Sequence, residues 1–222
     1  VEVQSQLSGE IVSLKTGQRN SVEQGILGRA QDGLSEPVWP TVSQSITHRP
    51  DWIELETSKD AYTGRAKGHE SELLLYLKNG YKSRSPHRKS YLGFDLASID
   101  AKQIVSAELS LHFAPTGWGL ASHVPDASFS VYGILSDRPS WDESSLVNEN
   151  APANLMGGGD KLISDEVDKL GSFVIKQGVQ RGTFGIDGEK LTSFLRGRAG
   201  SELTLVVVRD TAEIDDGGLV HG

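Results

Sequence analysis

The sequence predicts an all-β fold: a β-sandwich of the jelly-roll type with one short helix near residues 188–196. Two neighbouring segments, residues 88–96 and 104–113, carry the prediction because apolar residues recur in them at every second position. These apolar residues are Leu92, Phe94, Leu96, Ala107, Leu109, Leu111 and Phe113. Alternation with a period of two is typical of strands that bury one face. Because the connection 97–103 is too short for a crossover helix, we expect these two strands to be antiparallel neighbours.

Further short strands with turn signals between them complete the prediction of a sandwich. Residues 72–77 form a continuous apolar run of strand length, and Asn79-Gly80 predicts a turn after it. The other predicted strands cover residues 52–56, 129–134, 167–175, 183–186 and 202–208.

The predicted helix begins after Asp187, a residue type that commonly caps helix N-termini. Leu191, Phe194 and Leu195 follow at helical spacing, and Gly197 lies where the pattern ends.

The organisation along the chain predicts a jelly-roll domain at residues 51–222. Residues 1–50 are polar and interrupted by glycine and proline. They are interpreted as an N-terminal extension, able to add a strand or two to the domain, or as the remnant of a preceding module. No signal-peptide core opens the sequence, which suggests a mature or trimmed segment.

Composition excludes several classes of function. The 222 residues include no cysteine, so disulfides, thiolate metal sites and a cysteine nucleophile are excluded. The net charge of -8 argues against nucleic-acid binding. No apolar run approaches the roughly 20 residues that a membrane span needs, so we expect none.

One segment of this acidic chain carries a local excess of positive charge. Five cations lie within residues 78–89 beside a histidine and aromatic residues, and no acid interrupts them. Arginine matches a carboxylate or sulfate in a bidentate manner, and an aromatic face stacks on a sugar ring. The candidate ligand-binding residues are Tyr81, Lys82, Arg84, His87, Arg88, Lys89 and, on a separate glycine-flanked loop, Trp118. The alternatives are an ordinary solvated loop for the cations and a plug over the end of the sandwich for Trp118.

A second cluster consists of acidic residues that follow three glycines. Carboxylate oxygens are the ligands that Ca²⁺ prefers, so we expect any bound metal to be a structural calcium. The candidate ligands are Asp160, Asp165, Glu166 and Asp168. Their spacing matches no EF-hand loop, and Asp60, Asp95 and Asp215-Asp216 are alternatives.

Nothing in the sequence predicts catalysis. The six histidines are scattered, and no zinc-protease, nucleophile-elbow or phosphate-loop motif is present. Asp142 and Glu143 could in principle serve a glycosidase, but carboxylates adjacent on one loop tend to diverge. We therefore expect a non-enzymatic protein, and we interpret Trp141 beside this pair as a packing residue.

The ordered series of motifs resembles the DNRLRE (disaggregatase-related) domain family, part of which is classified as carbohydrate-binding modules. The matching motifs are residues 57–62, the strand through Leu77, Arg88 to Leu96 with Ile104 to Phe113, Val131-Tyr132, Trp141 to Leu146 with Pro152, and Ile186-Asp187 with Leu191 to Leu195. Together they cover about residues 57 to 208.

The resemblance implies a jelly-roll module of a large extracellular or cell-surface protein of bacteria or archaea, set beside other modules of the same polypeptide. The function expected from it is non-catalytic binding of a polysaccharide, and the cations favour an acidic one. The alternative is a structural or adhesive spacer domain with no glycan ligand. The cation-rich loop departs from the family pattern, and a final strand that the family would place after residue 222 is missing.

Overall fold

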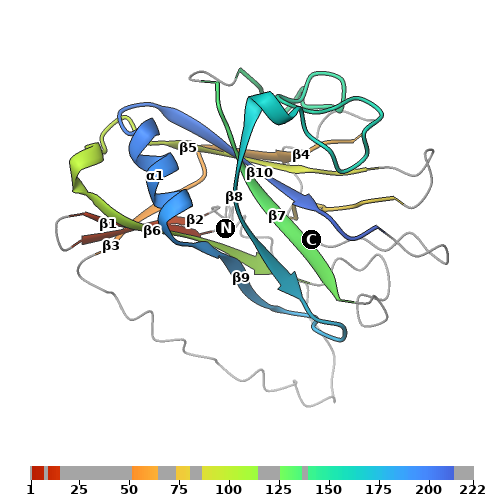
Figure 1. The fold of residues 1–222 in the computed structure, drawn as a ribbon, viewed down its shortest axis with the longest axis horizontal. Coiled ribbons are helices and arrows are strands. Elements are labelled where there is room, and N and C mark those ends of the chain that lie inside the picture. The colour runs from red at the N-terminus through yellow and green to blue at the C-terminus, as the bar shows by residue number, and fades with distance from the viewer. Residues whose placement is uncertain are drawn as a thin grey trace, which may run out of the picture.

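The computed structural model describes residues 2–7, 10–15, 52–64, 74–80, 87–114, 126–136 and 140–212. These residues form two five-stranded sheets and one α-helix (Figure 1). The predicted all-β sandwich is therefore confirmed, while the jelly-roll connectivity stays a prediction. In the same described ranges, no helix has the length and apolar character that crossing a bilayer requires.

The two sheets are called the first and the second sheet, according to which contains the N-terminal strand. The second sheet is antiparallel throughout and has the order β4-β5-β10-β7-β8. Its strands are β4 (Lys59–Tyr62), β5 (Ser90–Asp95), β10 (Glu202–Arg209), β7 (Ala127–Ile134) and β8 (Val167–Ile175).

The other sheet, here called the first sheet, has the order β1-β3-β2-β6-β9. Its strands are β1 (Glu2–Leu7), β3 (Trp52–Glu56), β2 (Glu10–Lys15), β6 (Ile104–Phe113) and β9 (Gly182–Asp187). β2 runs parallel to β3 and β6, and β6 pairs with β9 in antiparallel register. Two 3-10 turns, η1 (Ala101–Gln103) and η3 (Ser164–Glu166), precede β6 and β8.

The two strands expected to pair with each other belong to different sheets, so that prediction was wrong. β5 pairs with β4 and β10, whereas β6 pairs with β9 and the N-terminal strands. The chain crosses between the sheets through η1, and the alternating residues of the two strands meet face to face in the main core. Leu92, Phe94 and Leu109 are fully buried there, and Leu111 is partly buried at its margin.

The apolar run at residues 72–77 was also predicted as a strand, and its described part is not one. Within residues 74–80 the structure has isolated bridges at Leu77 and Lys78 but no strand, and Lys78 is paired antiparallel with Arg88. Leu75 and Leu77 pack against the main core, and the Tyr76 carbonyl accepts a hydrogen bond from the Ser90 hydroxyl. Apolar packing and isolated bridges hold these described residues in place without a continuous strand, so hydrophobicity alone was misleading.

The single described helix, α1 (Glu189–Arg198), crosses one end of the sandwich (Figure 1). Leu191 and Leu195 are fully buried in the main core, and the Phe194 ring lies over Gly133 of β7. The predicted cap at Asp187 was wrong, because β9 continues through that residue and Gly188, with φ of 101°, takes the N-cap position.

Residues 140–163, here called the outer segment, cover the outward face of the second sheet. Leu146, Ala151 and Ala153 of this segment join Tyr91 and Val206 in a second buried cluster. The second sheet is thus buried on both faces, which explains why β10 is apolar at consecutive positions instead of alternating.

Candidate ligand-binding site

The strand geometry places the described residues of the predicted cationic site on two opposite faces of the second sheet. Residues 87–89 lead into β5, with Arg88 bridged to Lys78, so consecutive side chains point to opposite faces of the second sheet. Arg88 lies on the side of the main core, and His87 and Lys89 lie on the side of the outer segment. The candidate residues Tyr81, Lys82, Arg84 and Trp118 lie outside the described residues.

The Arg88 guanidinium is held by two aromatic rings. Its central carbon lies 5.3 Å from the ring centroids of both Tyr62 and Tyr76. The two rings are buried and meet edge to face at 5.1 Å, so they form a rigid platform. Cation–π contact of this kind fixes an arginine without using its N–H donors.

Arg88 is half-buried, and no carboxylate in the described ranges pairs with its guanidinium. A planar fork of N–H donors, held in place and not neutralised, can bind a carboxylate or sulfate in a bidentate manner. Of the three described residues that were predicted to bind ligand, Arg88 is the one with this property.

Lys89 is only 3% exposed. Its Nζ donates hydrogen bonds of 2.6 Å to Asn154 Oδ1 and to the Gly159 carbonyl oxygen, both in the outer segment. Burial lowers the pKa of Lys89 to about 8, an effect that the negative charge of Asp160 partly opposes. These contacts use the ammonium group inside the chain, away from any surface ligand.

His87 is also tied to neighbouring loops. Its Nδ1 accepts a hydrogen bond of 3.3 Å from the backbone N–H of Gly80. A Cβ at Gly159 would lie 3.0 Å from the His87 ring, and with φ of +67° this position suits glycine on both counts. Desolvation, followed by the positive charge of Lys89, lowers the pKa of His87 below its usual 6.5, so the ring is neutral at pH 7.

The four acids predicted to bind calcium are distributed over three elements. Asp160 follows Gly159 and acts electrostatically on Lys89 and His87. Asp165 and Glu166 lie in η3, and Asp168 is exposed on β8. Among the described residues, no group of three or more acids and histidines is arranged to hold a metal ion.

The alternative calcium ligands within the described ranges make local contacts. Asp60 accepts a hydrogen bond from the Thr57 hydroxyl, and Asp95 accepts one from the backbone N–H of Ala97. Asp215 and Asp216 lie outside the described residues.

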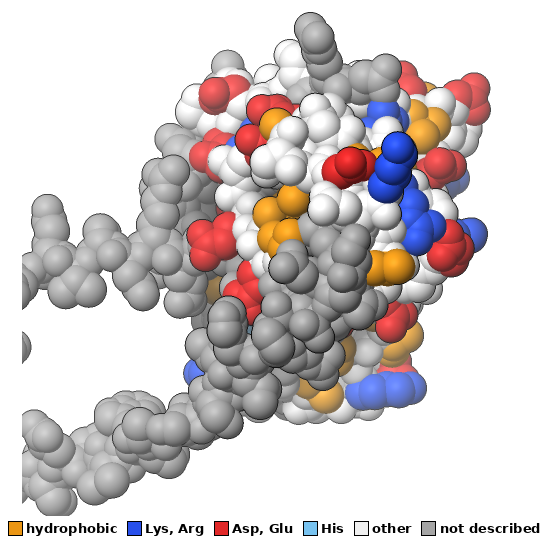
Figure 2. Space-filling view, turned by 90° about the vertical axis from the view of Figure 1, so that its left-hand side faces the viewer, with side chains coloured by type: hydrophobic (Ala, Val, Ile, Leu, Met, Phe, Trp, Pro, Cys, Tyr) orange, Lys and Arg blue, Asp and Glu red, His pale blue; other side chains and the backbone are white. Residues whose placement is uncertain are grey.

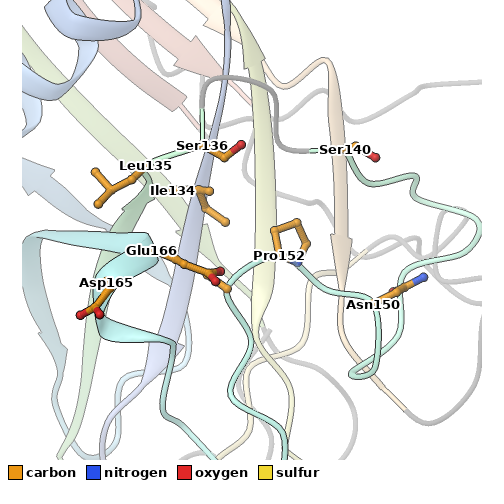
Figure 3. Close-up of a pocket in the computed structure, with 9 residues that line it drawn as sticks. Ile134, Leu135, Ser136, Ser140, Asn150, Pro152, Asp165 and Glu166 are labelled. Atoms are coloured by element: carbon orange, nitrogen blue, oxygen red, sulfur yellow. The ribbon is translucent and has the colours of Figure 1, made fainter.

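A pocket of about 450 Å³ lies between the end of β7, the outer segment and η3. Figure 3 shows the Glu166 side chain directed toward Pro152, with Ile134 above it in the view, while Asp165 points away. The side chains of Asp165 and Glu166 therefore lie in different surroundings, although the two residues are adjacent in the sequence.

Trp141 packs as the sequence predicts. Its Nε1 donates a hydrogen bond of 2.9 Å to Thr204, its ring meets Tyr91 edge to face, and the Lys59 ammonium lies 4.9 Å from its centroid. These contacts leave little of the indole free for stacking on a sugar, although a shallow pocket of about 210 Å³ lies beside it.

The neighbouring acids Asp142 and Glu143 both line this shallow pocket, but their carboxylates have different partners. The Asp142 carboxylate accepts bonds from the Ser144 backbone and hydroxyl, and Glu143 Oε1 accepts a bond of 2.5 Å from the Asp60 backbone N–H. One acid is therefore bound to its own loop and the other to β4.

Acidic and basic side chains lie interspersed among the coloured atoms of the face in Figure 2.

Sequence reasoning missed Tyr62, whose place beside Arg88 follows from the register of β4 on β5, where Tyr62 pairs with Ser90. It also missed Asn154 and Gly159, because the sequence of a polar loop does not indicate which side chains the loop packs against.

The sequence matches no family model and no curated protein. The resemblance to the DNRLRE domains therefore stays a prediction that rests on the motifs themselves.

Proposed function

We propose that this protein is a non-catalytic carbohydrate-binding module of an extracellular multi-modular protein, and that its ligand is an anionic polysaccharide. The observation that carries the proposal is the Arg88 guanidinium, which lies on the Tyr62 and Tyr76 rings without a carboxylate partner in the described ranges. Lys82 and Arg84 come shortly before it in the sequence and add positive charge to the same segment. Trp118 is proposed as a stacking residue for the sugar, and the fold is proposed to be a jelly roll.

The proposed chemistry is an anionic group of the glycan received by the guanidinium fork. Arg88 is preorganised by its two ring contacts, so little side-chain entropy is lost on binding. A charge-assisted contact at a half-exposed site contributes about 1 to 2 kcal/mol, which corresponds to roughly 5- to 30-fold in affinity.

A structural or adhesive spacer domain is the second candidate. The internal contacts of two predicted ligand-binding residues favour it, because Lys89 bonds to the outer segment and His87 bonds to the Gly80 backbone. A spacer would show no retardation by any glycan.

Affinity electrophoresis through gels that contain alginate, pectate, a sulfated glycan or a neutral glucan tests the proposal. We expect retardation by an acidic gel, weakened in Arg88→Gln and unchanged in Arg181→Gln, which removes an equal charge from an exposed position. Wild-type mobility unchanged in every gel would favour the spacer, and retardation of Arg88→Gln equal to that of wild type would reject Arg88 as the contact.

A further inference from the structure

The side chains of Lys89 and Asn154 lie close enough to each other to react covalently. The distance from Lys89 Nζ to Asn154 Oδ1 is 2.6 Å. Because a C=O bond is about 1.23 Å long, Nζ lies at most about 3.8 Å from the amide carbon Cγ. Reacting atoms held at about 3 to 3.5 Å are in a near-attack arrangement, so this upper limit exceeds that range by only a few tenths of an ångström.

Both partners are fixed by the fold. Asn154 Nδ2 donates a hydrogen bond of 2.7 Å to the Asn148 carbonyl, which orients the amide. The backbone on either side is anchored, since the Tyr91 hydroxyl bonds to the Pro152 carbonyl and Asn154 forms a β-bridge with Leu162. Nζ is held in turn by its second bond, to the Gly159 carbonyl.

The surroundings favour an uncharged amine. Both hydrogen-bond acceptors of Lys89 Nζ are neutral carbonyl groups, and a buried ammonium without a hydrogen-bonded carboxylate is costly. Burial lowers the pKa of Lys89 to about 8, so an appreciable share of the side chain is the nucleophilic free amine near neutral pH. Asp160, six residues after Asn154, is the acid whose charge acts on this lysine.

We propose that Lys89 and Asn154 form an intramolecular isopeptide bond. The neutral Nζ attacks Cγ of Asn154, and the bond from Cγ to Nδ2 breaks. The proton that Nζ loses passes to the departing nitrogen, which leaves as ammonia. One amide replaces another, so the step needs no oxidant, reductant or metal.

The bond would join the second sheet covalently to the outer segment, at the edge of the second buried cluster. This inference is independent of glycan binding, because it concerns the face opposite Arg88. Either can fail without the other.

Intact-mass spectrometry of the denatured chain tests it. We expect a mass lower than that of the unmodified sequence by one ammonia, and a proteolytic fragment in which the peptides of Lys89 and Asn154 are linked. Lys89→Arg and Asn154→Ala should have their full sequence masses. Lys161→Arg, an exposed lysine of the same segment, should keep the loss.

A wild-type mass equal to that of the unmodified sequence would overturn the proposal, and this measurement does not depend on whether a variant folds. Loss of ammonia that persists in Lys89→Arg would overturn it as well, because a cyclic imide at an asparagine would then explain the mass.

Discussion

Replacing Gly133 by alanine should displace helix α1 from the sandwich. A Cβ at this position of β7 would meet three carbon atoms of the Phe194 ring, the farthest at 2.6 Å, so the ring has to move. Phe194 is 9% exposed and lies between the fully buried Leu191 and Leu195, which leaves it little freedom. Overpacking of this kind costs about 1 to 3 kcal/mol, and the rigid surroundings favour the upper half of that range.

For a chain of this size, 2 to 3 kcal/mol lowers Tm by roughly 4 to 12 °C. Urea unfolding followed by circular dichroism measures the loss directly. Gly197→Ala is the matched control, because a Cβ there meets nothing within 4 Å and Gly197 lies inside α1. Helix propensity predicts that this change raises stability by up to about 1 kcal/mol.

A smaller side chain at position 194 should relieve the clash with the alanine Cβ at position 133. In the double variant Gly133→Ala with Phe194→Leu, the loss of stability should be less than the sum of the two single losses by about 1 kcal/mol or more. If Gly133→Ala is as stable as wild type, the contact between α1 and β7 described above is wrong.

Three further predictions concern stability. The lowered pKa of His87 means that the unfolded chain binds more protons below about pH 6.5, so stability should fall as pH drops through that value, and urea titrations of His87→Gln should show a flatter pH profile. Arg196→Ala should cost about 1 to 2 kcal/mol in urea unfolding, because Arg196 Nε and Nη2 bond to the Ile104 and Val105 carbonyls, whereas Arg181→Ala should change little. Calcium is predicted to raise Tm by linkage and EDTA to lower it; superimposable melting curves in the two would end the calcium hypothesis.

Strand identity could be predicted from the sequence to a large extent, but strand pairing could not. The alternation in residues 88–96 and 104–113 identifies side chains of the main core, as Phe94 and Leu109 show, although Tyr91, which is not one of the alternating positions, is buried against the outer segment as well. The same alternation is compatible with a pair in one sheet or with strands facing each other across the core, so it could not place β5 and β6. The continuous apolar run of β10 did carry a further signal, since a strand without a polar face must be covered on both sides.

The candidate site was predictable in composition but not in arrangement. Charge patterning singled out residues 78–89, yet extending the strand pattern back to Arg88 is what separates it from His87 and Lys89. The aromatic partner Tyr62 comes from β4, and the acceptors of Lys89 come from the outer segment. Contacts between segments so distant in the sequence depend on register and packing, and no local pattern encodes them.

The salt dependence of binding tests most directly whether Arg88 is the contact for an anionic glycan. Retardation is measured at rising sodium chloride concentration on the acidic gel that retards wild type most strongly. Exposed charge contacts are screened over a Debye length of about 8 Å at physiological ionic strength, so wild-type affinity should fall steeply with salt.

Arg88→Gln should bind more weakly and with a flatter salt dependence, and the same should hold more strongly when Arg84 is changed as well. Trp118→Ala should weaken binding while leaving the salt dependence intact, because stacking is far less sensitive to salt. Identical salt curves for wild type and Arg88→Gln would contradict the account.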